Sequence, residues 1–211
     1  MRSISIIGTG NMARTIGALA VAGGNTVEIM GRDQSKAADL AKALGGSTTT
    51  GEFGAVPAGD IVILAVLYTG VAEVVARYGD ALAGKVIVDI TNPFTSAADG
   101  LTTRDGTSAA QEIADAAPAS ASVVKAFNAV FRNVLAQDRP LDVFVAGDDA
   151  HAKAGVEAFI ESLGLRPMDV GGLKMARWLE GTGLVLVGLA RNAVGNIDFA
   201  LGVTLAGRTA A

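Results

Sequence analysis

The chain has no cysteine and a single histidine. Disulfide bonds, thiolate metal sites and cysteine nucleophiles are therefore excluded. The histidine, His151, follows Gly147-Asp-Asp149 at the start of a polar helical stretch, where we expect it to face solvent. Neither a histidine-based metal cluster nor a Ser-His-Asp triad stands out. We predict no metal site and no catalytic side chain.

Aromatic residues and excess charge are scarce as well. Aromatic side chains make up 5% of the 211 residues, so Ala, Val, Leu and Ile must fill the core of this half-hydrophobic chain. The 17 basic and 21 acidic residues leave a net charge of −4, which argues against a nucleic-acid or anionic-membrane surface. The longest apolar stretch, residues 181–190, is shorter than the ~20 residues that cross a bilayer. The first strand begins without a signal peptide, and we expect a soluble cytoplasmic protein.

Apolar runs alternate with helical patterns along most of the chain. This alternation predicts an α/β fold of the Rossmann-like, doubly wound kind, with a mostly parallel sheet covered on both faces. The expected strands are residues 3–7, 26–30, 61–65, 86–89, 123–126, 143–146 and 166–170. The expected helices are residues 11–21, 34–44, 71–78, 108–116 and 151–163. Residues 89–107 are rich in Gly, Thr, Asp and Pro, and predict a long loop at the carboxyl edge of the sheet, where such folds bind ligands.

From residue 172 the pattern is helical and apolar. We therefore divide the chain into a nucleotide-binding domain, residues 1–170, and a helical C-terminal segment, residues 171–211. The segment lacks a polar stripe, so it should be buried against the domain or in a homodimer interface, where Gly183 and Gly188 would allow close helix contact. We expect the homodimer, and we expect Trp178 to lie in the core.

The first strand runs directly into Gly8-Thr-Gly10-Asn-Met-Ala13, which a helical pattern follows. This is the Gly-x-Gly-x-x-Ala fingerprint of a dinucleotide site in its required context of strand, turn and helix. Gly8 permits the tight turn, Gly10 lets a pyrophosphate approach the backbone, and Ala13 lets the helix pack close to the strand. The amino end of the helix then faces the phosphates.

The end of the second strand favours NADP over NAD. An NAD site usually has an acidic residue there, whereas this chain has Met30-Gly31 followed by Arg32. Lys36 lies one helical turn after Arg32, so both cations can face a 2′-phosphate. The alternative is that both side chains are simply solvated. Asp33 opposes the phosphate interpretation, since it could cap the helix or weaken selectivity.

Few other polar residues fall at the expected ligand edge. Asn92 and Pro93 follow the fourth strand there and are assigned to the cofactor site. Lys125 and Asn128 end the next strand and are assigned to substrate, although the apolar stem of Lys125 could instead lie on the sheet. The lack of a strong acid or base favours hydride transfer between two redox cofactors, which needs alignment and water exclusion more than proton chemistry.

Along nearly its whole length the chain resembles the NADPH-dependent reductases of the deazaflavin coenzyme F420. The late stretch, residues 147–180, is more specific than the fingerprint, because nothing generic makes it recur. The matching segments are Gly8-Thr-Gly10-Asn11-Met12, Arg32 with Lys36, residues 61–68, Gly147-Asp-Asp149, residues 164–171 and residues 176–180.

The resemblance implies that NADP(H) and F420 stack in one cleft and that a hydride passes directly between C4 of the nicotinamide and C5 of the deazaflavin. By position, the 2′-phosphate side would be held by Thr9, Arg32 and Lys36, the pyrophosphate by Gly10, Asn11 and Met12, and the nicotinamide by Ala65, Val66, Leu67 and Tyr68. The chain departs from the family at Gly31-Arg32-Asp33, where known members have Ser-Arg-Arg, and at residues 126–129.

Residues 124–128, Val-Lys-Ala-Phe-Asn, also look like the cytosolic reductase domain of membrane ferric reductases, which use a flavin. A flavin, quinone or imine acceptor therefore stays open, and so does a non-enzymatic NADP sensor. The partner we expect is a small-molecule redox coenzyme.

Overall fold

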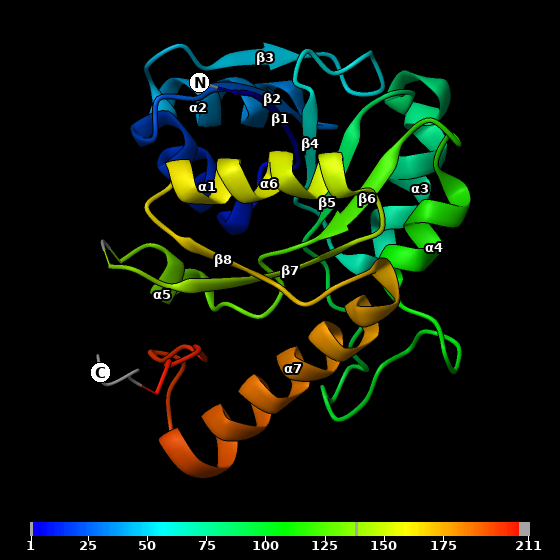
Figure 1. Cartoon of the computed structure of the whole chain (residues 1–211). Coiled ribbons are helices and arrows are strands. Elements are labelled where there is room, and N and C mark those ends of the chain that lie inside the picture. The colour runs from blue at the N-terminus through cyan, green and yellow to red at the C-terminus, as the bar shows by residue number, and fades with distance from the viewer. Residues whose placement is uncertain (1, 138, 207–211) are drawn as a thin grey trace, which may run out of the picture.

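The computed structural model describes residues 2–137 and 139–206. Its centre is an eight-stranded sheet in the order β3-β2-β1-β4-β5-β6-β7-β8 (Figure 1). The strands are β1 (Ser3–Ile7), β2 (Thr26–Met30), β3 (Thr49–Gly51), β4 (Ile61–Leu64), β5 (Val86–Asp89), β6 (Ser122–Lys125), β7 (Asp142–Gly147) and β8 (Arg166–Asp169). Only the β6–β7 pair is antiparallel among the described strands. The predicted α/β Rossmann-like fold with a mostly parallel sheet is confirmed.

Helices cover both faces of this sheet (Figure 1). They are α1 (Asn11–Ala22), α2 (Gln34–Leu44), α3 (Tyr68–Tyr78), α4 (Ala109–Ala116), α5 (Arg132–Leu135), α6 (Ala150–Ser162) and α7 (Ala176–Leu189). One core lies under α1, α2, α5 and α6, and the other under α3, α4 and the start of α7. All four residues of β4 are buried, as expected for a strand covered on both sides.

The amino ends of the helices differ in a way that matters for the site. Side chains cap α2, α4 and α6: Asp33, Ser108 and Asp149 each accept hydrogen bonds from backbone N–H groups of the first turn. Helix α1 begins after Gly10 and has no side-chain cap. Its first N–H groups are therefore free of side-chain competitors.

The C-terminal segment leaves the sheet after β8 and runs below it as α7 (Figure 1). Helix α7 buries Ala176, Leu179, Glu180, Gly183 and Leu186. The prediction that Trp178 belongs to the core is wrong, because its side chain is 66% exposed on the other side of the helix. The boundary at residue 170 stays a prediction, and it falls directly after β8.

Two short elements were not predicted. Strand β3 has three residues, none of them buried, so no apolar run marks it. Helix α5 is a single turn. Helix α3 begins at Tyr68. The predicted start, residue 71, was too late because Thr69 and Gly70 interrupt the apolar pattern on which the prediction was based. Among the described helices, none is long and apolar enough to cross a membrane.

Candidate functional site

A cleft opens at the carboxyl ends of β1, β4 and β5 and consists of two adjoining cavities. The β2-side cavity has a volume of about 440 Å³ and is lined by Ile7–Thr9, Gly31–Asp33, Lys36, Phe53, Ala65–Leu67, Thr69, Gly70 and Val74. The β5-side cavity has about 480 Å³ and is lined by Gly10–Met12, Ala65–Tyr68, Ile90–Asn92 and Phe94. Ala65, Val66 and Leu67 form the wall that both share. The cleft lies at the edge where doubly wound folds bind nucleotides.

The glycine turn passes between the two cavities. Gly8 has φ +130°, and a Cβ atom there would lie 2.3 Å from the carbonyl oxygen of Ala65. Its N–H group donates to the carbonyl of Met30 at 2.8 Å. At Gly10 a Cβ atom would have no protein atom within 4 Å. The turn therefore holds the uncapped end of α1 open to the cleft, which is the arrangement that binds a pyrophosphate.

Two cations stand at the outer end of the β2-side cavity. The guanidinium of Arg32 is 3.8 Å from the carboxylate of Glu73, and the ammonium of Lys36 is 3.6 Å from that of Asp33. Both cationic side chains are more than 70% exposed, so these pairs are weak. Hydrogen bonds from the Ser35 hydroxyl and the Lys36 N–H group hold the pKa of Asp33 below its usual value.

Tyr68 borders the β5-side cavity at the start of α3. Its hydroxyl donates a 2.7 Å hydrogen bond to Oε2 of Glu112 on α4. Burial and this carboxylate together raise the pKa of Tyr68 to about 12, so the phenol is neutral at physiological pH. Glu112 lies 44 residues from Tyr68 and was not expected from the sequence.

The two asparagines expected at the site meet behind the β5-side cavity. Asn92 donates to the carbonyl of Asn128 at 2.8 Å, and Asn128 donates to Oδ1 of Asn92 and to the carbonyl of Leu179. Asn92 lines the cavity, whereas Asn128 is 7% exposed and lies behind it. Pro93 is buried and does not line either cavity.

Lys125 is not brought into the cleft, contrary to the expectation of a substrate contact. Its side chain is fully buried, and its ammonium donates to Asp89 at 2.7 Å, to the Thr91 carbonyl at 2.6 Å and to Glu180 at 2.8 Å. The physical reason is that all three ammonium protons are used within the protein. Glu180, on α7, was not foreseen as its partner.

The remaining polar groups offer no metal site: the described residues contain no cluster of three His, Cys, Asp or Glu side chains. His151 is exposed on α6, as expected. The cleft is thus built from backbone N–H groups, two exposed cations and apolar walls, with Tyr68 as a neutral hydroxyl. These features fit a phosphorylated redox nucleotide.

Comparison with known proteins gives a family match over the N-terminal part of the chain. The model of the family described as "NADP oxidoreductase coenzyme F420-dependent" matches residues 3–93. These residues include every residue that lines the two cavities except Phe94. Over residues 3–93 the chain therefore matches the F420-dependent NADP oxidoreductase family. The predicted resemblance is confirmed, and the predicted enzyme class, an NADP-dependent oxidoreductase, agrees with the description of this family.

Two curated relatives are each 32% identical to this chain. Metalloreductase STEAP3 from Rattus norvegicus is 32% identical over 188 residues, which are 87% of this chain and 37% of that protein. The F420-dependent NADP reductase from Methanocaldococcus jannaschii is 32% identical over 140 residues, 62% of each chain. The chain thus spans less than two thirds of the length of either relative.

A solved structure matches almost end to end. A provisionally assigned F420-dependent NADP-reductase from Arthrobacter sp. FB24 superposes with a TM-score of 0.84 at 26% identity, covering 97% of this chain and 100% of that one. The whole fold, α7 included, therefore recurs in a protein of similar length.

Proposed function

We propose that the cleft binds NADP(H) along its length. The 2′-phosphate would lie between Arg32 and Lys36, the pyrophosphate over the first turn of α1, and the nicotinamide in the β5-side cavity. The observation that carries this assignment is the uncapped end of α1, placed between an exposed cationic pair and an apolar cavity. The space over Gly10, which a Cβ would enter, is where the backbone can approach the phosphates.

We further propose that the enzyme passes a hydride between NADP(H) and the deazaflavin coenzyme F420. Support comes from the lining of the β5-side cavity, which includes no Asp, Glu, His, Lys or Arg among the described residues. Such a lining suits transfer between two aligned rings, where the protein positions the reactants and excludes water. The relative from Methanocaldococcus jannaschii bears this activity in its name.

In this mechanism the chain contributes geometry. When bound, the nicotinamide supplies or accepts the hydride. Ala65, Val66 and Leu67 form the wall against which it would lie, and the neutral Tyr68 closes the cavity toward α4. The proton that accompanies deazaflavin reduction would come from solvent, because no charged acid lines the cavity in the described part of the chain.

The test follows NADPH absorbance while F420, FMN, FAD, a quinone and a small imine are added in turn. We expect saturable NADPH binding and turnover with F420. Turnover with another acceptor alone would overturn the deazaflavin assignment, and binding without any turnover would favour a sensor. Failure to bind NADPH would overturn the whole proposal.

A flavin acceptor is the second candidate. Two observations favour it. The alignment with Metalloreductase STEAP3 extends over 87% of this chain. Residues 124–128 read Val-Lys-Ala-Phe-Asn, the segment that resembles the flavin-using membrane ferric reductases. In the same assay, turnover with FMN or FAD and not with F420 would establish it.

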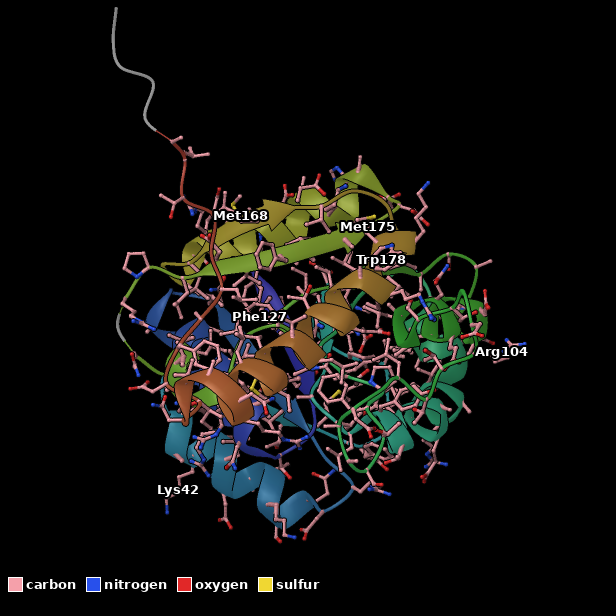
Figure 2. The ribbon with its side chains drawn as sticks, turned by 90° about the horizontal axis from the view of Figure 1, so that it is seen from below. Lys42, Arg104, Phe127, Met168, Met175 and Trp178 are labelled. Carbon is pink, nitrogen blue, oxygen red and sulfur yellow. The ribbon has the colours of Figure 1, made fainter. Side chains whose placement is uncertain are left out.

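The cation pair gives a separate test of NADP selectivity. Replacing Arg32 with alanine should raise the KM for NADPH about tenfold, equivalent to about 1.4 kcal/mol, and leave that for NADH nearly unchanged. Lys36→Ala should act in the same direction. Lys42→Ala is the matched control, since Lys42 is exposed on the same helix but does not line the cleft (Figure 2). Equal effects on both nucleotides would contradict the phosphate assignment.

A further inference from the structure

Three charged side chains meet in the interior next to the β5-side cavity. Asp89 ends β5, Lys125 ends β6, and Glu180 lies in the second turn of α7; each side chain is 0% exposed. The Lys125 ammonium contacts both carboxylates, at 2.7 and 2.8 Å. Oε1 of Glu180 also accepts from the N–H group of Ala109 on α4, at 3.0 Å. We call these three residues the buried ionic cluster.

The buried ionic cluster does not balance its charge. Two carboxylates face one ammonium, so one negative charge is in excess when both acids are ionised. Oε2 of Glu180 has no hydrogen-bond partner among the described residues. A buried carboxylate oxygen without a partner is costly, and an added proton would relieve that cost. In agreement, burial raises the pKa of Glu180, and the attraction of Lys125 only partly opposes it.

The excess charge lies directly behind the cavity wall. Thr91 lines the cavity, its carbonyl accepts from Lys125 at 2.6 Å, and its N–H group donates to Asp89 at 2.8 Å. Tyr68 also lines the cavity, and the charge of Glu180 contributes to its raised pKa. Helix α7 packs on the same wall, because a Cβ at Gly183 would lie 3.0 Å from Oδ1 of Asn92. One layer of residues separates the buried ionic cluster from the cavity.

We propose that the buried ionic cluster sets the preference of the cleft between oxidised and reduced nicotinamide, with Glu180 as the positioning residue that gains or loses the proton. This inference rests on the proposed NADP(H) site. The oxidised ring carries a positive charge and the reduced ring does not, so the excess negative charge stabilises the oxidised ring selectively. Binding of NADP+ to protein with a protonated Glu180 therefore releases a proton to solvent. Binding of NADPH does not.

Each element packed against Glu180 supplies a group that bears on this titration. Lys125 on β6 and Asp89 on β5 supply the charges, α4 supplies the Ala109 N–H group, and α3 supplies Tyr68. Tyr68 stays neutral because its pKa is about 12. Glu112, the partner of Tyr68, lies one residue further out.

The experiment measures the dissociation constants of NADP+ and NADPH between about pH 5 and 9 in matched buffers. The 2′-phosphate is common to both nucleotides, so its own titration cancels in the ratio of the two constants. We expect the preference for NADP+ over NADPH to increase with pH, by about three- to tenfold across the range. In the Glu180→Gln variant the ratio should not change with pH, and it should equal the ratio of the unaltered protein at low pH. Glutamine retains Oε1, which accepts from Lys125 and Ala109, but cannot ionise.

Two controls separate this role from a structural one. Glu157→Gln makes the same chemical change on α6, away from the cleft, and should leave the pH dependence intact. Calorimetric binding of NADP+ and of NADPH to the unaltered protein, in buffers of different ionisation enthalpy, counts the protons that each nucleotide releases. The 2′-phosphate contributes equally to both counts, so the excess for NADP+ measures the proton from Glu180 without any variant.

The outcomes are distinct. If neither nucleotide binds, the proposed function fails. If both bind and the ratio does not change with pH, or if Glu180→Gln keeps the slope, the role of the cluster is overturned. A purely structural cluster would change both dissociation constants equally.

Discussion

At the scale of single residues, the two glycines of the fingerprint are required for different physical reasons. Gly8 has a positive φ, and a side chain would collide with the Ala65 carbonyl at 2.3 Å, so the fold itself excludes any other residue. A side chain at Gly10 would meet no protein atom within 4 Å. The fold tolerates another residue at Gly10, and only a bound nucleotide would exclude it.

These two reasons predict different outcomes when alanine replaces Gly8 and when it replaces Gly10. Gly10→Ala should leave the melting temperature nearly unchanged and weaken NADPH binding about tenfold or more. Gly8→Ala should lower the free energy of unfolding by about 2 kcal/mol or more even without nucleotide. Thermal unfolding and NADPH titration of both variants test this. Gly155→Ala on α6 is the control, with unaltered binding. A loss of stability in Gly10→Ala would contradict the assignment.

The same scale shows which site residues a sequence can reveal. Gly8, Gly10, Arg32 and Lys36 are recognisable because they act within one strand-turn-helix unit, and the structure places them around one cleft. The role of Lys125 was not recognisable. Its position at a strand end follows from the apolar pattern, but its direction depends on Glu180, 55 residues away on another element.

At the scale of elements, helix α2 shows how one residue serves both stability and selectivity. Asp33 caps the helix by accepting from the N–H groups of Ser35 and Lys36. It also holds a negative charge 3.6 Å from Lys36, beside the proposed 2′-phosphate. Both roles considered from the sequence are therefore compatible with the structure.

Replacing Asp33 with asparagine or with alanine separates these two roles. Asn caps helices about as well as Asp, so Asp33→Asn should keep the melting temperature and lower the Kd for NADPH by about two- to fivefold through lost repulsion. Its effect on NADH should be small. Asp33→Ala also removes the cap and should lower the melting temperature by about 2–4 °C. If Asp33→Asn weakens NADPH binding, the carboxylate does not repel the phosphate.

Most elements were predictable because burial sets their periodicity. Strand β1, for example, has three isoleucines among its five residues and is buried from Ile4 to Ile7, and its predicted bounds match those observed. Strand β3 was not predicted, because it is a strand through its pairing with β2 and not through burial.

At the scale of the whole molecule, the C-terminal segment is only partly covered by the rest of the chain. Its apolar helix pattern without a polar stripe predicts burial against the domain or in a homodimer interface. Helix α7 buries one side against the domain and exposes Trp178 and Val185. The helix crosses the front of the view in Figure 2, where Trp178 is labelled. Val194 and Ile197, which follow the helix, are exposed apolar residues as well. No charged residue lies between Glu180 and Arg191 to solvate the exposed side of α7.

This exposed apolar side is the basis for predicting a homodimer. A two-fold axis would bring the same side of α7 from two copies together, and Gly188 would allow the helices to approach closely. Gly183, also expected at this contact, is instead buried against Asn92 and Phe94 of the same chain. Sedimentation equilibrium should therefore give a dimer mass, and Val185→Asp should shift it toward the monomer at low micromolar concentration. Val56→Asp is the matched control, because Val56 is also exposed but lies far from α7 in the sequence, in the loop before β4. A monomer mass for the unaltered protein at every concentration would show that no second copy covers α7.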